Sequence, residues 1–295
     1  MTEISLETSY TIVESFFKYF EGNFHMNYLL RHYYGKRGFR QRLSITDIMA
    51  LNIYRFFMEI SNLKAFHRFV QKFHKKEYPN FPNYENFMKA TNKSLPFMVF
   101  FVNAILARNR ELCKNKEAHF IDSTPVEVCK NNKISRHRVT KGYASRGKST
   151  KGWFFGFKLH GICTDDMTVE NLIFTTGSVH DSKMAKDVTK EIIGKAFADA
   201  GYQLKPEILS ELADNGLFMH NATRKNMNRL ISKEQFDFIE KRNVIETVWS
   251  VLKGSFDLVC TRARSMKGMF RHFFYSIAAF LLSKMRFDPK LTISY

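Results

Sequence analysis

The sequence predicts a mixed α/β protein in which a mostly helical N-terminal part precedes a domain that combines strands and helices. Apolar residues recur with helical spacing through residues 1–115. Short apolar runs typical of strands begin only after Asn115, and beyond them strands alternate with helices. Hydrophobic residues make up 44% of the 295 residues, which is enough for a packed core.

Residues 1–115 are expected to form the helical domain. Ser44 and Asp47 have the spacing of a capping box, which indicates the start of a helix. Pro96 begins an apolar segment, and proline is favoured in the first turn of a helix. The expected helices are 48–60, 62–76 and 96–113, with Pro79 and Pro82 breaking the chain between the last two.

The helices expected over residues 44–76 are joined by a short turn. They fit a helix-turn-helix and an ordinary helical bundle equally well, so both interpretations stay open. A basic cluster just before them favours a DNA-facing surface, although charge by itself usually marks a solvated face. The cluster consists of Arg31, His32, Lys36, Arg37, Arg40 and Arg42.

Residues 116–295 are expected to form the α/β domain. Strands are predicted over 119–121, 153–161, 169–175, 196–198 and 217–219. The polar segment Thr164-Asp165-Asp166 predicts a turn between the second and third of them. Helices are predicted over 182–194, 244–256 and 269–285.

The charge balance predicts a polyanionic partner. Lys and Arg outnumber Asp and Glu by 46 to 28, for a net charge of +18. The longest apolar stretches, 97–107 and 273–282, are far shorter than the ~20 residues of a membrane-spanning helix, so nucleic acid is favoured over a membrane. The N-terminus is polar and acidic, and the four cysteines form no CxxC pair. We therefore expect a reduced, cytoplasmic protein.

Three acidic residues have the placement of a metal-dependent nuclease site. Asp122 and Asp199 each follow a short apolar strand, and strand ends are where sites gather in α/β sheets. Glu246 lies on an expected helix and shares one face with Arg242 and Lys253. Three carboxylates can hold two divalent cations for phosphodiester chemistry. Other acids compete for these roles, and spacing alone does not separate Asp199 from Asp214; the rest are Asp165, Asp166, Glu170 and Asp181.

A long acid-free segment, residues 130–151, lies beside Asp122 and is interpreted as a loop that follows the phosphates of DNA rather than as a merely solvated face. Its basic residues are Lys130, Lys133, Arg136, Arg138, Lys141, Arg146, Lys148 and Lys151. Trp153 and Trp249 are expected in the core rather than stacked on bases, and His160 is read as a core histidine.

Seven segments spread over most of the chain, in the same order, resemble the DDE transposases of bacterial insertion sequences, and most closely the insertion-sequence family numbered nine-eight-two. They are FPNYENF from Phe81, FIDSTPVEVCK from Phe120, KGWFFGFKLHG from Lys151, TTGSVHDSK from Thr175, ADAGY from Ala198, RKNM from Arg224 and RNVIETVWSVLK from Arg242. One departure is Ala200, where the family often has a basic residue.

The resemblance implies a ribonuclease-H-like catalytic domain. It assigns Asp122, Asp199 and Glu246 as the catalytic, metal-binding triad and Lys253 as the companion basic residue. Mg²⁺ or Mn²⁺, as two ions, is the expected cofactor. His180 and Asp181 match a family motif, and we expect them to support the site or a turn rather than to bind metal.

The predicted function is therefore a transposase that binds the terminal inverted repeats of its element and cuts and joins DNA. It is expected to act as a homodimer on the DNA, at the nucleoid in a bacterial cytoplasm. Two alternatives stay open. One is a non-catalytic DNA-binding protein derived from a transposase. The other is a covalent recombinase, for which the sequence offers Arg264, Arg271, His272 and Tyr275 or Tyr295.

Overall fold

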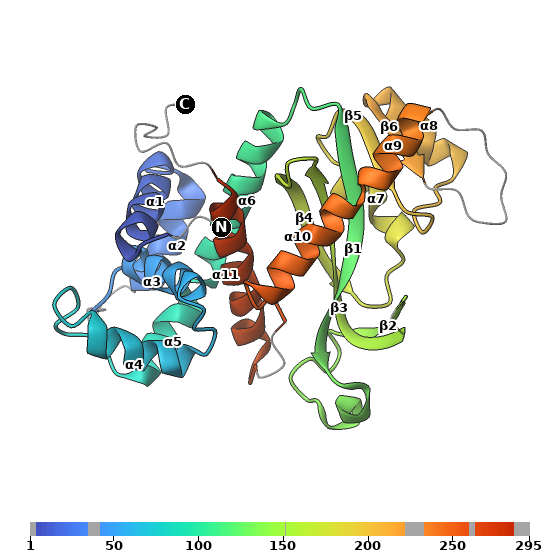
Figure 1. Ribbon diagram of the computed structural model, residues 1–295. Coiled ribbons are helices and arrows are strands. Elements are labelled where there is room, and N and C mark those ends of the chain that lie inside the picture. Colours follow the sequence, from blue (N-terminus) through green and yellow to red (C-terminus); the bar gives the residue numbers. More distant parts are fainter. Residues whose placement is uncertain (1–3, 35–41, 151, 222–232, 260–262, 286–295) are drawn as a thin grey trace. The chain divides into compact units, whose positions relative to one another are not determined.

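The computed structural model describes residues 4–34, 42–150, 152–221, 233–259 and 263–285. The chain divides into two compact units (Figure 1). The first contains the residues up to Asn103 together with 254–258 and the residues from Ala263 onward, and the second contains Ala104–Lys253 with 259–262.

The first unit is helical, as predicted. Its helices are α1 (Leu6–Tyr19), α2 (Phe24–Tyr34), α3 (Ile45–Phe57), α4 (Leu63–Phe73), α5 (Tyr84–Lys93), the first half of α6 (Leu95–Leu112) and α11 (Met266–Lys284). The predicted capping box is present, because Ser44 Oγ accepts from the Asp47 N–H and the Asp47 carboxylate accepts from the Ser44 N–H. Leu51, Phe66 and Phe87, from α3, α4 and α5, share one apolar core.

Helix α11 belongs to the first unit, although residues 116–295 are expected to form one domain. The helix is buried along most of its length and packs against α3 and α5. Tyr275 is fully buried, with its hydroxyl 2.5 Å from Ser94 Oγ. A helix that is apolar on nearly all sides must be enclosed by others, and the N-terminal helices enclose this one.

The second unit contains one six-stranded mixed sheet (Figure 1). Its strands are β1 (Ala118–Cys129), β2 (Ser145–Ser149), β3 (Gly152–Thr164), β4 (Val169–Thr176), β5 (Gly194–Ala198) and β6 (Leu217–Asn221). The order is β2-β3-β1-β5-β6, with β4 also paired to β3. Strands β1, β5 and β6 are parallel, whereas β3 runs antiparallel to β1. The α/β fold class is confirmed, and this sheet is the kind expected of a ribonuclease-H-like domain.

The helices of the second unit include α7 (Ala185–Val188), α8 (Pro206–Asp214), α9 (Lys233–Lys241) and α10 (Asn243–Gly254). The helix expected over 182–194 is wrong in extent: a short 3-10 turn over Asp181–Met184 leads into the single turn of α7. The chain then turns, with Glu191 at a φ of 65° and Gly194 at 115°, which brings it back into the sheet as β5. A left-handed residue cannot continue a helix.

Alternation along the strands gives the sheet two different faces. On one face, Phe120 and Phe197 pack against each other, and Phe197 stacks on Phe238 of α9. On the other, Ile121 and Ala198 join a core with residues of α7 and α8. We call these the α10 face and the α7–α8 face, because α10 crosses the first of them (Figure 1).

Among the described residues, no single helix is both long enough and apolar enough to cross a membrane. Only α5 and α6 taken together meet the two conditions, and this pair is bent by 47°.

Candidate active site

Two of the predicted acids lie side by side on neighbouring parallel strands, at the point where the pairing of β1 with β5 stops. The expectation that Asp122 ends a strand is wrong, because β1 continues to Cys129 while paired with β3; Asp199 does follow the last residue of β5. Ile121 of β1 is in register with Ala198 of β5, so the next residues, Asp122 and Asp199, occupy adjacent positions on strands about 4.8 Å apart. Alternation puts both on the α10 face, two residues beyond Phe120 and Phe197. The charge of Asp199 raises the pKa of Asp122, as expected for two carboxylates in one site.

The Asp122 carboxyl is largely buried. Burial is the main cause that raises its pKa, to about 7, and Asp199 adds to this. The backbone N–H of Ser123, the charge of Arg242 and the indole of Trp249 act in the opposite direction. Trp249 Nε1–H donates to Asp122 Oδ2 over 3.2 Å. The Asp122 carboxylate thus accepts from the Ser123 N–H and from the Trp249 indole and lies near the charge of Arg242. These interactions together do not offset the cost of burying the charge, so the pKa stays raised.

Trp249 also fixes the position of α10 over the sheet. Its ring covers Gly161, the β3 residue paired with Asp122, and a Cβ at Gly161 would lie only 2.6 Å from Trp249 Cη2. Glycine is therefore required for this close approach of helix and strand. Ile245, Val248 and Leu252 are buried on the same side of α10, and this apolar stripe holds the helix in place.

Glu246 lies one helical turn before Trp249, toward solvent. Its side chain is 56% exposed, and Glu246 Oε1 is 3.5 Å from Arg242 Nη2. Lys253 is half-buried near the end of α10. The structure therefore brings Asp122, Asp199 and Arg242 together beneath α10 and leaves the Glu246 carboxylate at the exposed edge of that helix.

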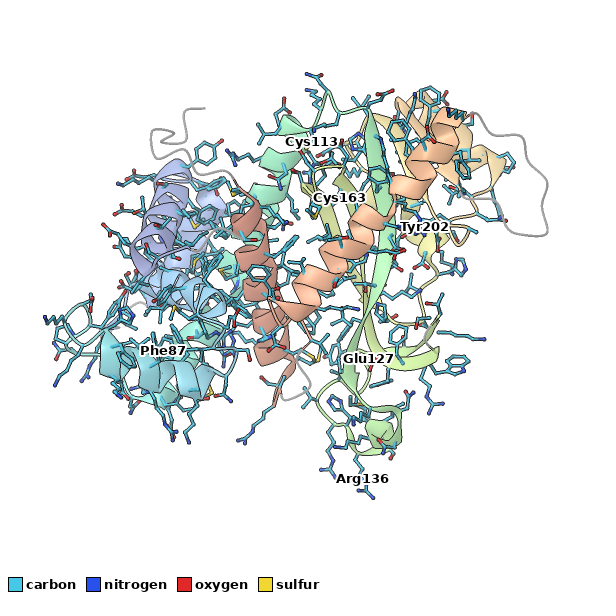
Figure 2. The ribbon with its side chains drawn as sticks, viewed as in Figure 1. Phe87, Cys113, Glu127, Arg136, Cys163 and Tyr202 are labelled. Atoms are coloured by element: carbon cyan, nitrogen blue, oxygen red, sulfur yellow. The ribbon has the colours of Figure 1, made fainter. Side chains whose placement is uncertain are left out.

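The carboxylates suit a hard divalent cation, which takes oxygen ligands. The described part of the chain contains no group of three or more His, Cys, Asp or Glu side chains arranged to hold a metal, so ligation by the predicted triad stays a prediction. One further observation fits a cation here, namely the mutual repulsion of Asp122 and Asp199. The buried Tyr202 (Figure 2) is part of the core on the α7–α8 face, and burial, followed by the charge of Asp181, raises its pKa well above the usual value.

Asp181 lies behind Asp122, on the α7–α8 face. It accepts a hydrogen bond from Ser123 Oγ over 2.7 Å and pairs with Lys158 Nζ at 3.0 Å. The Ser123 N–H in turn donates to Asp122, so Asp181 braces the residue that orients the acid. With its charge paired, Asp181 is placed to support Asp122 rather than to bind metal. The neighbouring His180 is exposed and caps the following 3-10 turn, with Nδ1 2.8 Å from Ser182 Oγ.

His160 is a core histidine, as expected. It is fully buried in the middle of β3, with Nε2 2.8 Å from Thr175 Oγ1 and Nδ1 3.6 Å from Asp181 Oδ1. Burial lowers its pKa to about 4. The imidazole is therefore neutral near pH 7 and adds no positive charge to the Lys158–Asp181 pair.

The predicted DNA-binding residues of the acid-free segment are exposed. They are Arg136 at the end of a 3-10 helix, Arg138 and Lys141 in the following loop, and Arg146 and Lys148 on β2. Lys151 lies outside the described residues. Of the two tryptophans, the core prediction is right for Trp249, 5% exposed, and wrong for Trp153, 62% exposed.

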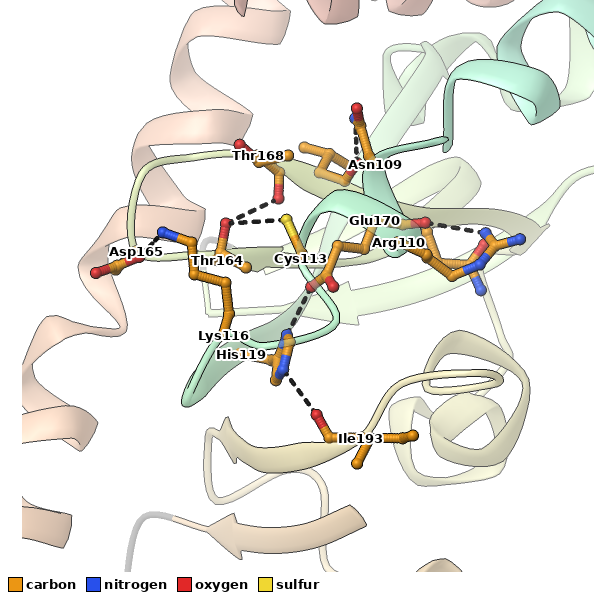
Figure 3. A network of polar contacts seen from close by, with 12 residues as sticks. Asn109, Arg110, Cys113, Lys116, His119, Thr164, Asp165, Thr168, Glu170 and Ile193 are labelled. Atoms are coloured by element: carbon orange, nitrogen blue, oxygen red, sulfur yellow. Dashed lines mark hydrogen bonds and ion pairs between the residues drawn. The ribbon is translucent and has the colours of Figure 1, made fainter. Parts of the chain in front are cut away.

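Most competing acids are occupied elsewhere. Asp165 and Asp166 pair with Lys116, and Glu170 is buried against His119, with 2.7 Å between Glu170 Oε2 and His119 Nδ1 (Figure 3). Asp214 is exposed at the end of α8 and is not among the main influences on the pKa of Asp122.

Three of the residues suggested for a covalent recombinase are engaged within the first unit, whereas Arg264 is exposed. Tyr275 is buried against Ser94, Arg271 Nη1 donates to Asn92 over 2.8 Å, and His272 is buried with Nε2 2.6 Å from the Asp257 carbonyl oxygen. Tyr295 lies outside the described residues.

Sequence reasoning missed three residues that shape the site, namely Trp249, Ser123 and Lys158. For Trp249 a signal existed, because it follows Glu246 by three positions and so lies on the same side of the helix. Lys158 stands two residues before His160 on β3, but its pairing with Asp181 depends on contacts between segments far apart in the sequence.

Comparison with protein families shows a match. The model of a family described as "Transposase DDE domain" matches residues 112–266, just over half of the chain. The matched segment contains all six strands, α10 and the three acids discussed above. No curated protein and no solved structure matches the chain.

Proposed function

Because the chain belongs to the transposases with a DDE domain, we propose that it binds the terminal inverted repeats of an insertion sequence and catalyses metal-dependent cleavage and strand transfer of DNA. The seven sequence segments support the narrower placement in the insertion-sequence family numbered nine-eight-two. The observation that carries the proposal is the pair Asp122 and Asp199 at adjacent positions of β1 and β5 beneath the helix that bears Glu246.

The three carboxylates are proposed to hold Mg²⁺ or Mn²⁺, as two ions. Such ions activate an attacking oxygen and stabilise the leaving oxygen of a phosphodiester. Trp249 and the Ser123 N–H keep the Asp122 carboxylate in one orientation, and Asp181 keeps Ser123 in place. The side chain of Glu246, which is exposed and contacts Arg242, is proposed to complete the oxygen set when substrate and cations are present.

The cations of the protein complement the substrate. Arg242 acts on Asp122 electrostatically, so a phosphate brought to that carboxylate comes within reach of the guanidinium. Lys253, two turns after Glu246 on α10, is proposed as a second phosphate contact. In the first reaction the attacking group is water, and in the second it is a DNA 3′-hydroxyl, with no covalent bond between protein and DNA.

DNA is proposed to lie along the basic residues of the 130–151 segment, and Lys151 is proposed to contribute with them. These residues contact phosphates and add affinity without sequence preference. Recognition of the terminal repeats is assigned to residues 1–115, the proposed DNA-end-binding domain, and cleavage to residues 116–295, the proposed catalytic domain, of which α11 packs within the first unit. Cutting of both element ends requires two copies, so we propose a dimer on DNA, acting at the nucleoid in the bacterial cytoplasm.

The experiment that tests this function is strand cleavage of a DNA duplex carrying the element's end, in Mg²⁺ and in EDTA. Asp122→Asn keeps the size of the side chain and its acceptor for Trp249 but removes the charge. We expect it to bind end DNA and to lose cleavage. Asp214→Asn, an exposed acid at the end of α8, is the matched control and should cut normally. Wild-type cleavage by Asp122→Asn, or cleavage in EDTA, would contradict the proposal.

A further inference from the structure

An exposed tryptophan at the start of β3 has no part in the site described above. Trp153 is 62% exposed, whereas the other tryptophan of the chain, Trp249, is 5% exposed. Tryptophan is highly buried on average, because an exposed indole leaves a large apolar surface in water. The neighbouring Tyr143, just before β2, is 63% exposed. Two large exposed aromatic residues near one hairpin indicate a contact surface.

The surroundings of Trp153 are strongly basic. The chain has no acidic residue between Glu127 and Asp165, a segment that contains both strands of the β2–β3 hairpin. Lys148 is the cross-strand partner of Trp153, and its Nζ lies 5.9 Å from the centre of the indole ring. Arg146 is two residues before Lys148 and, by alternation, on the same side of the hairpin. This side of the hairpin therefore presents aromatic and cationic groups together.

The hairpin is fixed before any ligand arrives. Asn131 Nδ2 donates to the carbonyl oxygen of Trp153 over 2.7 Å, which ties the strand to the preceding basic loop. That loop carries Arg136 at its far end (Figure 2). At Gly147 a Cβ would lie 2.2 Å from the Gly177 carbonyl oxygen, so β2 packs tightly on the segment after β4. A platform whose backbone is already ordered loses little entropy on binding.

We propose that Trp153 is a stacking site for an unpaired nucleobase of the DNA substrate, with Arg146 and Lys148 contacting the adjoining phosphates. The proposal rests on the proposed function for the identity of the substrate as DNA. Within a duplex each base face is covered by its neighbours, so an exposed indole gains a stacking partner only from a base that has left the helix or ends a strand. Lysine and arginine side chains that contact only phosphates, by contrast, bind both single strands and duplexes and do not require an unpaired base.

The position of Trp153 limits where that base lies. Strand β3 leads from Trp153 to Gly161, the partner of Asp122, eight residues further along. At about 3.3 Å per residue this is about 26 Å, the length of about eight steps of duplex DNA. The unpaired base is therefore expected some distance from the cleaved phosphate and not at it.

Affinity for single-stranded and duplex DNA distinguishes this role from a purely electrostatic one. The full chain is titrated in EDTA against a fluorescein-labelled single strand and against a blunt duplex of the same sequence, by anisotropy. Trp153→Ala should weaken single-strand binding by about 5- to 150-fold, the usual effect of removing one stacked aromatic residue, and leave duplex binding within about twofold. Trp153→Phe should retain most of the single-strand affinity. Phe218→Ala, which removes an aromatic residue 55% exposed on β6, should change neither.

Intrinsic fluorescence provides a second measurement. Because Trp249 is buried, stacking of a base should quench the emission of Trp153, and the quenching by the single strand should vanish in Trp153→Phe. Equal losses on single strand and duplex in Trp153→Ala, or quenching that persists in Trp153→Phe, would overturn the proposal. A changed oligomeric state with unchanged DNA affinity would also overturn it and identify an interface between copies. Since no cleavage is measured here, these outcomes leave the role of Asp122 untouched, whereas a wild-type chain that binds neither DNA contradicts the proposed function itself.

Discussion

Removal of the Asp122 charge should stabilise the metal-free protein, although it abolishes the proposed activity. The folded-state pKa of about 7 lies above the ordinary value of 3.8, mainly because the carboxyl is buried. Between these values the folded state keeps a proton that the unfolded state has released, so the free energy of unfolding falls as pH rises, by about 1.4 kcal/mol per pH unit. Above pH 7 the whole loss, about 4 kcal/mol, is present.

Asp122→Asn does not titrate and so escapes this loss. The assay is urea denaturation in EDTA at pH 5 and pH 8, for the wild type and the variant. Comparing the two pH values cancels any pH-independent change in packing. The two pH units between 5 and the folded pKa correspond to an increase in the variant's relative stability of about 3 kcal/mol. Asp214→Asn, with its exposed carboxylate, should show no such increase. An equal stability difference at both pH values for Asp122→Asn would refute the buried, charge-repelled site.

Three other perturbations test the same site. Millimolar Mg²⁺ at pH 8 should raise the unfolding midpoint of the wild type but not of Asp122→Asn, since a ligand that binds only the folded state stabilises it; equal shifts in both proteins would place the ion elsewhere. Asp181→Asn leaves Lys158, 12% exposed, without its carboxylate partner. The variant should lose about 2 kcal/mol of stability in urea denaturation and cleave DNA more slowly. Unchanged stability would mean that the Lys158–Asp181 pair, 3.0 Å apart, is not formed in solution. Gly161→Ala places a methyl group against the ring of Trp249. It should lower the free energy of unfolding by about 1–3 kcal/mol and reduce cleavage. A variant with normal stability and activity would show that α10 does not lie on β3 as described.

The overall architecture follows from local patterns in the sequence. The capping box at Ser44 and the periodic apolar residues predicted the helices α3, α4, α6, α10 and α11 to within a few residues. Strand-like runs predicted β3, β4, β5 and β6. The expected helix over 182–194 was wrong, since its apolar pattern continues through Ile192 and Ile193 while the backbone turns at Glu191. Backbone conformation at one residue is decided by the contacts around it, and periodicity does not record those contacts.

Exposure was harder to predict than secondary structure. Trp153 and Trp249 both have apolar neighbours in the sequence, yet Trp153 is exposed and Trp249 is the anchor of α10. Burial of a single side chain depends on which elements cover its strand or helix, and only the tertiary structure decides that. The basic residues nearby were correctly expected to be exposed, because unpaired cations are rarely buried.

The sequence by itself determined which groups are available for chemistry: two acids that follow short apolar runs, an acid and two cations on one helix face, and a long basic segment without acids. The tertiary structure alone decided how these groups are held. The register of β1 with β5 puts Asp122 beside Asp199, and the gap at Gly161 admits the Trp249 ring that donates to Asp122. Lys158 neutralises Asp181 on the opposite face. These contacts join residues up to 127 positions apart, and only the packing of the sheet and its helices brings such distant segments together.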